Sequence, residues 1–172
     1  NATTRLAEVA TGAGNSTTFS DSEGVLMVEA SSDDTTSVIW SVSDGSNSNA
    51  VSLYYGNGGV LSDIFSSAGT RTLLASMSIG LRPNMNKFLI KYKSTDLAIW
   101  LNGFELAVST QTISLNGLNE LKGAYGSGSF TFHGNVKQIQ YFDSILDSQQ
   151  LEQLTSWQSF SDMAEGQLYT IE

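Results

Sequence analysis

Hydrophobic and polar residues alternate along much of this chain with the period of a β-strand, in which every second side chain faces the core. The pattern is strongest over residues 87–110. Two apolar runs, 88–92 and 97–101, precede the dipeptide Asn102-Gly103, which favours a tight hairpin turn, and a third run starts at Phe104. Three strands joined by two short turns predict an antiparallel meander.

The same pattern, interrupted by loops rich in Gly, Ser and Asn, predicts further strands on both sides of this meander. They cover residues 24–30, 38–42, 51–55, 60–65, 72–79, 121–125 and 130–141, and the last is expected to bend at His133-Gly134. Roughly ten short strands at close spacing predict an all-β fold, an antiparallel two-sheet jelly-roll sandwich.

One short C-terminal helix is predicted over Ser148–Thr155. Asp147 can cap its first turn, and Gln150 stands at the reciprocal position of a capping box. Leu151 and Leu154 are expected to face inward.

A single domain is predicted, because 172 residues suffice for one full core and not for two. Residues 1–21 are expected to form an arm or an edge strand, and residues 22–155 the sandwich with its helix. Residues 156–172 form a tail whose apolar side chains are expected to pack on the domain or on a neighbouring subunit. The chain starts at Asn1, so we expect a fragment or a processed product.

The charge and composition of the chain limit the classes of molecule that it is expected to bind. The net charge of −9 repels phosphate backbones and anionic lipids, so neither nucleic acid nor membrane is an expected partner, although the same charge favours a bound cation. No apolar run approaches the roughly 20 residues of a spanning helix. The chain has no cysteine, which excludes disulfides and fits a cytosolic fold or a virion protein assembled in a cytosol.

Two stretches carry a resemblance to a known fold family. The run LAIWLNG at 97–103, and the run GNVKQIQYF at 134–142 with the helix that follows, resemble the concanavalin A-like lectin/glucanase fold in its laminin-G-like form. The match spans about residues 24–155. It implies a concanavalin A-like jelly roll with a lectin-like, carbohydrate-binding function.

A narrower resemblance is to modules in structural proteins of tailed bacteriophages. It rests on the segments RLAEVATG at 5–12, SEGVLMVE at 22–29, SDG at 43–45 and MAEGQLYT at 163–170. It implies a homo-oligomeric protein of the virion surface, on a tail fibre or a capsid appendage, assembled in the bacterial host cytoplasm. Such a protein recognises host glycans or contacts other virion proteins.

Catalysis is not expected. Glucanases of this fold place an acid and a nucleophile on one strand in the pattern E-x-D-x-E, because hydrolysis needs two carboxyl groups a few ångströms apart, and this spelling does not occur here. His133 is the single histidine, so a Ser-His-Asp triad would have to use it, yet no nucleophile-elbow spelling is present.

Calcium is the one cofactor that the sequence suggests. The resemblance implies a loop-rim site built from carboxylate and amide oxygens, which calcium prefers. Asp44 and Asn47 could supply them, or Asp33 and Asp34. Asp-Gly and Asn-rich loops are also ordinary turn chemistry, so both interpretations of the 44–49 loop stay open.

Trp100 and Tyr125 are the candidate sugar-stacking residues, with Asp44, Asn47 and Asn49 as polar partners in a nearby loop. Trp100 alternates with Leu97, Ile99 and Leu101, so it faces the other side of its sheet. It is a binding platform if that side is open, and a core residue if the side is covered.

Two hypotheses follow. The first is a non-catalytic glycan-binding module of a phage virion surface protein. The second is a structural assembly module that has the same sandwich, lacks a glycan ligand and oligomerises through its apolar tail.

Overall fold

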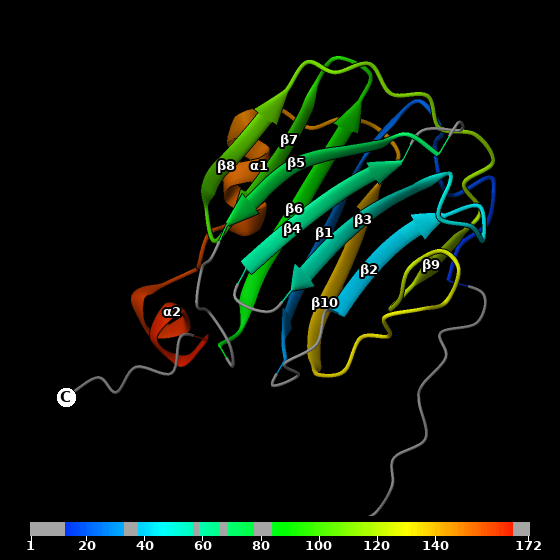
Figure 1. Cartoon of the computed structure of the whole chain (residues 1–172). Coiled ribbons are helices and arrows are strands. Elements are labelled where there is room, and N and C mark those ends of the chain that lie inside the picture. Colours follow the sequence, from blue (N-terminus) through cyan, green and yellow to red (C-terminus); the bar gives the residue numbers. More distant parts are fainter. Residues whose placement is uncertain (1–12, 33–37, 57–58, 66–68, 78–83, 167–172) are drawn as a thin grey trace, which may run out of the picture.

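The computed structural model describes residues 13–32, 38–56, 59–65, 69–77 and 84–166. They form two five-stranded antiparallel sheets packed face to face, with two short helices beside them (Figure 1). The predicted all-β sandwich is therefore confirmed.

Each sheet mixes strands that are distant in sequence. Sheet A contains β1 (Glu23–Ser31), β6 (Asn86–Lys93), β7 (Leu97–Leu101), β8 (Phe104–Ser109) and β10 (Asn135–Phe142), in the order β10-β1-β6-β7-β8. Sheet B contains β2 (Val38–Ser43), β3 (Ala50–Gly56), β4 (Gly59–Phe65), β5 (Arg71–Met77) and β9 (Glu120–Lys122), in the order β5-β4-β3-β2-β9.

The predicted meander is β6, β7 and β8. Asn102 and Gly103 form the turn between β7 and β8 with φ angles of 49° and 88°. Positive φ at both central residues is the geometry of a type I′ hairpin turn, which matches the twist of the flanking strands. The predicted meander is therefore present, with a register shift between Ile99 and Trp100 in the pairing of β7 with β8.

The main core lies between the two sheets. Leu26, Ile90 and Tyr92 of sheet A meet Val51 and Leu53 of sheet B, and all five are buried. A second apolar cluster lies on the opposite face of sheet A and includes Val25, Met27, Leu89, Ala98, Trp100 and Leu151. β1 therefore contributes to both clusters, as its continuous apolar sequence predicts.

Helix α1 (Ser148–Thr155) covers the second cluster and confirms the predicted helix (Figure 1). The Asp147 carboxylate accepts the Gln150 backbone N–H at 2.9 Å, and the Gln150 side chain accepts the Asp147 backbone N–H at 3.0 Å. Both bonds of the capping box are present. The helices of the described segments are too short to cross a membrane.

A second helix, α2 (Phe160–Gly166), lies in the segment that the sequence predicts as a tail. It packs back on the domain, because Ala164 is buried and the Met85 backbone N–H donates to the Gly166 carbonyl at 2.9 Å. The sequence predicted one helix, and the structure has α2 in addition, whose first turn is capped by the Ser159 hydroxyl, which accepts the Asp162 backbone N–H at 3.1 Å. Residues 167–172 lie outside the described segments.

Two strand predictions were too long. β9 ends at Lys122 rather than at 125, and β10 begins at Asn135 rather than at 130. The residues between them form a closed loop, in which Phe132 N–H donates to the Gly123 carbonyl at 2.7 Å and Tyr125 N–H to the Ser129 carbonyl at 2.8 Å. The predicted loop at Asp33 and Asp34 and the first twelve residues of the predicted arm lie outside the described segments.

Candidate functional site

The outer face of sheet B points away from the core, and the side chains described there on β2 and β3 include two serines and Tyr54. Val51 and Leu53 of β3 point into the core, so Ser52 and Tyr54 between and beyond them point outward. Ser41 of β2 pairs with Ser52 on this face, and both are fully buried. Another part of the chain must therefore cover them.

Residues 123–131, which we call the covering loop, lie on this face beside β2 and β9 (Figure 1). The Ser41 hydroxyl donates to the Ala124 carbonyl at 2.6 Å. Gly126 comes so close to the loop between β2 and β3 that a Cβ there would lie 2.0 Å from the Ser46 carbonyl oxygen. Glycine is thus required for the covering loop to pack against this neighbouring loop.

Two further hydrogen bonds hold the tip of the covering loop, one from each of its neighbouring segments. Ser127 N–H donates to the Asn47 side-chain oxygen at 3.0 Å, and the Lys122 ammonium donates to the Gly126 carbonyl at 3.0 Å. Asn47 and Tyr125, two of the residues predicted from sequence, are therefore brought together by one short loop.

Three aromatic rings follow one another outward from the sheet, and we call them the aromatic corner: Tyr54, Tyr125 and Phe130. Tyr125 stacks on Tyr54 with ring centroids 6.1 Å apart and planes 20° apart. Phe130 meets Tyr125 edge-to-face at 5.4 Å and 84°. Both are arrangements that aromatic pairs prefer, and together they fix the positions of the outer rings.

Phe130 is strained and exposed. Its φ angle is 54°, in the left-handed region that bulky residues rarely adopt, and 53% of its surface is accessible. A non-glycine residue in this region costs on the order of 1–3 kcal/mol, and such strain clusters at functional sites. Exposed hydroxyls of Ser127 and Ser129, 3.1 Å apart, lie on the same loop.

The 44–49 loop stands next to the covering loop and is held by Asp44. Its carboxylate accepts hydrogen bonds from the Ser46 backbone at 2.8 Å, the Ser46 hydroxyl at 2.6 Å and the Asn49 amide at 2.8 Å. Partial burial by itself would raise the pKa of the Asp44 carboxyl, but the bonds from Ser46 and Asn49 outweigh it and hold this pKa below its ordinary value of 3.8.

The predicted calcium ligands Asp44 and Asn47 use their side-chain oxygens in hydrogen bonds within these two loops. Calcium takes six to eight oxygen ligands. Both Asp44 oxygens already accept hydrogen bonds, and the Asn47 oxygen accepts the Ser127 N–H. The described residues contain no group of three or more His, Cys, Asp or Glu side chains that could hold a metal ion. Calcium thus stays a prediction from sequence, and no step below depends on it.

Two buried polar atoms near this face lack a hydrogen-bond partner in the described part of the chain. They are the hydroxyl oxygen of Ser52 and the side-chain oxygen of Asn49. Asn49 was predicted as a polar ligand of the site, whereas the structure has its amide nitrogen committed to Asp44. Only its oxygen is unpaired.

Trp100 is not part of this face. It is 6% exposed and packs in the second apolar cluster, between sheet A and α1. Of the two interpretations of Trp100, the structure supports the core residue and contradicts the exposed platform. The hydrophobic alternation correctly placed Trp100 opposite Leu97 and Leu101, and α1 is the element that covers it.

Two residues of the aromatic corner were not among the predicted site residues. Tyr54 could have been found, because it alternates with the core positions Val51 and Leu53 and must face outward. Phe130 could not, since the pattern Phe130-Thr131-Phe132 reads as a strand. Its place in a loop depends on backbone bonds that periodicity does not encode.

The chain is similar in fold to several solved structures. The CBM40 of the Ruminococcus gnavus IT-sialidase, bound to alpha2,3 sialyllactose, superposes with a TM-score of 0.67 at 17% identity, over 83% of this chain and 92% of that one. The SAP-like pentraxin of Limulus polyphemus gives 0.57 at 13% identity, over 80% and 71% of the two chains.

The receptor-binding domain of botulinum neurotoxin type G gives a TM-score of 0.55 at 10% identity, over 77% of this chain and 37% of that one. No protein-family model matches this sequence, and no curated protein matches it. At these identities the comparisons establish the fold, a two-sheet jelly roll, and the function must be argued from the site.

Proposed function

We propose that this chain is a non-catalytic, lectin-like carbohydrate-binding module whose ligand stacks on the aromatic corner. The observation that carries this proposal is Phe130, a strained and half-exposed ring braced by Tyr125. Sugar rings present C–H faces that pack on flat aromatic surfaces, and their hydroxyls need nearby polar groups. Ser127 and Ser129 supply hydroxyls on the same loop.

The fold comparison supports the same class of ligand. The similar CBM40 was solved with alpha2,3 sialyllactose bound, so this jelly roll can carry a glycan site. The non-catalytic part of the proposal rests on the sequence, which lacks the paired-carboxylate pattern of the glucanases.

The setting on a phage virion surface is the finer part of the proposal. Its support is the similarity of the segments 5–12, 22–29, 43–45 and 163–170 to modules of tailed-phage structural proteins. In this setting the module sits on a tail fibre or a capsid appendage and binds host or environmental glycans.

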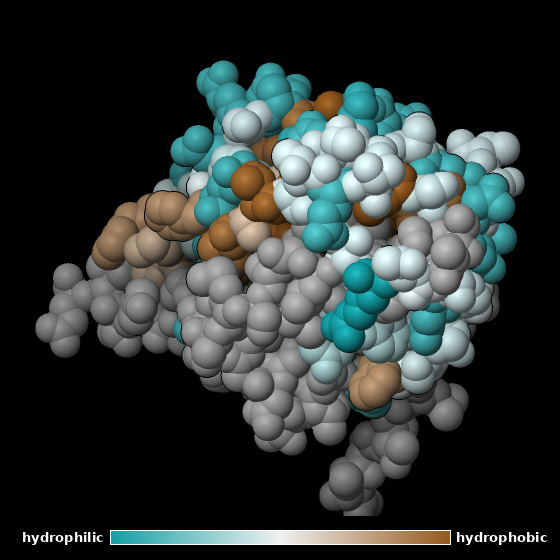
Figure 2. Space-filling model, turned by 45° about the horizontal axis from the view of Figure 1, so that its top comes forward, coloured by the Kyte–Doolittle hydropathy of each residue, from teal (hydrophilic) through white to brown (hydrophobic). Residues whose placement is uncertain are grey.

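An assembly role is the second candidate, and exposed apolar side chains favour it. Phe104 and Val108 of β8, an edge strand of sheet A, are 72% and 66% exposed, and Phe160 of α2 is 67% exposed. Figure 2 shows apolar atoms at the surface on the side where β8 and the helices lie. Exposed apolar side chains that gather on one side of a molecule are a feature of contact surfaces between proteins.

Variants separate the two functions. If the glycan proposal holds, Phe130→Ala loses binding to bacterial surface polysaccharides and keeps its sedimentation coefficient. If assembly through β8 holds, Val108→Lys changes the sedimentation coefficient and leaves any glycan binding intact. If the folded protein binds none of a panel of bacterial surface polysaccharides, the glycan-binding function is contradicted.

A further inference from the structure

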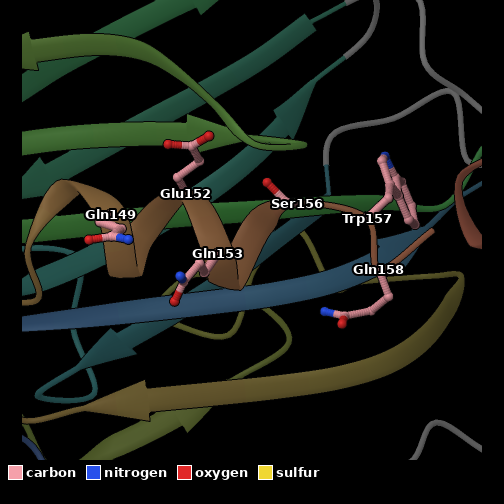
Figure 3. A pocket seen from close by; sticks show the side chains of 6 residues that line it. All are labelled: Gln149, Glu152, Gln153, Ser156, Trp157 and Gln158. Carbon is pink, nitrogen blue, oxygen red and sulfur yellow. The ribbon is translucent and has the colours of Figure 1, made fainter. Parts of the chain in front are cut away.

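A groove runs along the outer side of α1, on the side of sheet A that faces away from sheet B (Figure 3). Its volume is about 520 Å³, and it is lined by Gln149, Glu152, Gln153, Ser156, Trp157 and Gln158. Ligand pockets commonly measure about 300–1,000 Å³. The groove is therefore large enough for a small ligand and separate from the aromatic corner.

The end of α1 makes this surface concave. The helix stops at Thr155, and Ser156 turns the chain into an extended conformation with φ −72° and ψ 153°. Trp157 and Gln158 then stand at one end of the row of helix side chains, as Figure 3 shows. A helix surface alone is convex, so this turn is what creates the hollow.

Trp157 is held in place by neighbours outside the groove. The Lys87 ammonium lies 5.0 Å from the centre of the indole ring and donates to the Ser156 carbonyl at 2.8 Å. Gly166 of α2 packs so closely that a Cβ there would lie 2.7 Å from the indole Cη2. These contacts fix the indole, while its remaining surface lines the groove.

The lining chemistry matches a polyhydroxylated, uncharged ligand. The amides of Gln149, Gln153 and Gln158 each offer donors and an acceptor, and the Glu152 carboxylate can accept from two adjacent hydroxyls. The indole adds a flat apolar surface. Glu152 is the one charged side chain of the lining, and it is an anion that repels acidic ligands.

We propose that this groove is a second carbohydrate site, specific for neutral sugars and independent of the aromatic corner. Two sites on opposite sides of one small domain would let a single module hold two glycan chains, or two parts of one chain. The proposal stands on the α1 groove alone and does not require a ligand at Phe130.

Nuclear magnetic resonance of the ¹⁵N-labelled full chain tests this site directly. The probes are glucose, galactose, mannose and N-acetylglucosamine, each titrated separately, with sialic acid as the acidic comparison. We expect at least one neutral sugar to shift the Trp157 indole N–H signal and the side-chain amides of Gln149 and Gln153. Sialic acid is expected to leave these signals in place.

Three variants sharpen the test. In Gln149→Ala/Gln153→Ala the affinity of that sugar is expected to fall by about tenfold or more, which corresponds to about 1.4 kcal/mol. Gln111→Ala, at an exposed glutamine after β8, should bind like the wild type. Phe130→Ala should keep the Trp157 shift, so failure of the aromatic corner and failure of the groove give different results.

The groove proposal is overturned if none of the four neutral sugars moves the Trp157 and glutamine signals of the folded protein. It is overturned equally if Gln149→Ala/Gln153→Ala shows the same Trp157 indole shift with the same affinity as the wild type, because these glutamines would then not contact the sugar.

Discussion

Tyr125 stacks on Tyr54 with ring planes 20° apart, although one ring belongs to a loop and the other to the middle of sheet B. The contact fastens the covering loop to a rigid strand. Phe130 leans on Tyr125 in turn. The outer ring is therefore positioned before any ligand arrives, and a preorganised site loses less entropy on binding.

Replacing Phe130 by glycine should separate binding from stability. Glycine tolerates the φ angle of 54° without strain, so the relief of strain is expected to offset the lost contact with Tyr125. We expect the free energy of unfolding to change by no more than about 1 kcal/mol. Glycan affinity should fall by about tenfold or more, as for a central aromatic contact residue. Urea denaturation and isothermal titration calorimetry measure the two quantities.

Phe160→Ala is the matched control for that variant. Phe160 is also an exposed aromatic residue, but it lies on α2, which is not part of the covering loop. It should retain full affinity. A Phe130→Gly protein that binds as tightly as the wild type would remove the aromatic corner from the account.

Trp100→Ala should destabilise the protein and leave the binding of the remaining folded molecules unchanged. Truncating a buried tryptophan costs about 3–5 kcal/mol. Trp100→Phe should cost less, because it keeps a ring under α1 and removes an indole N–H that has no hydrogen-bond partner among the described residues. Thermal unfolding followed by circular dichroism compares the two. Equal stability of wild type and Trp100→Ala would contradict the core position of this side chain.

The stability contributed by Asp44 should depend on pH in one direction. Its folded-state pKa lies below the ordinary 3.8, so the unfolded chain binds the proton more tightly. The contribution is therefore complete above pH 3.8 and is lost as the pH falls through the lowered folded-state pKa. Because the loop is partly open to solvent, we expect its size to be on the order of 1 kcal/mol or less.

The variant Asp44→Asn measures this pH-dependent contribution to the free energy of unfolding. It should be less stable than the wild type at pH 7, and the difference should shrink in urea titrations at successively lower pH. A difference that grows on acidification would contradict the lowered pKa of Asp44.

A chelator should leave glycan binding unchanged. The side-chain oxygens of Asp44 and Asn47 accept hydrogen bonds from Ser46, Asn49 and Ser127. These bonds hold the loop in place without a metal ion. Titrations with calcium and with EDTA are expected to give the same affinity. Loss of binding in EDTA, restored by calcium, would show that the predicted calcium site exists.

The elements of this fold were predictable where a local rule sufficed. The meander followed from alternation and from Asn102-Gly103, and α1 followed from Asp147 and Gln150. In each case residues within a few positions of one another determine the geometry. The helix α2 was not predicted although it carries a local signal, because Ser159 stands three residues before Asp162 and accepts its backbone N–H at 3.1 Å. Packing of Ala164 and a hydrogen bond from Met85 hold α2 against the domain.

The site was predictable only in part, because it is assembled by contacts between distant residues. Tyr125 and Asn47 were identified by their residue type and by the neighbouring turns, and the structure joins them through Ser127. The alternation placed Trp100 on the correct face of sheet A, but the sequence did not show that α1 covers this face. No sequence pattern predicted that Phe130 is exposed, since its exposure depends on a loop that is closed by the hydrogen bond between Phe132 and Gly123.

The central claim is that the aromatic corner binds a glycan, and one titration tests it most directly. Labelled wild type, Phe130→Gly and Phe160→Ala would be titrated against a panel of bacterial surface polysaccharides. The account predicts saturable binding without cleavage by the wild type and by Phe160→Ala, with that binding lost in Phe130→Gly. Equal binding by all three proteins, or no binding by folded wild-type protein to any polysaccharide, would contradict it.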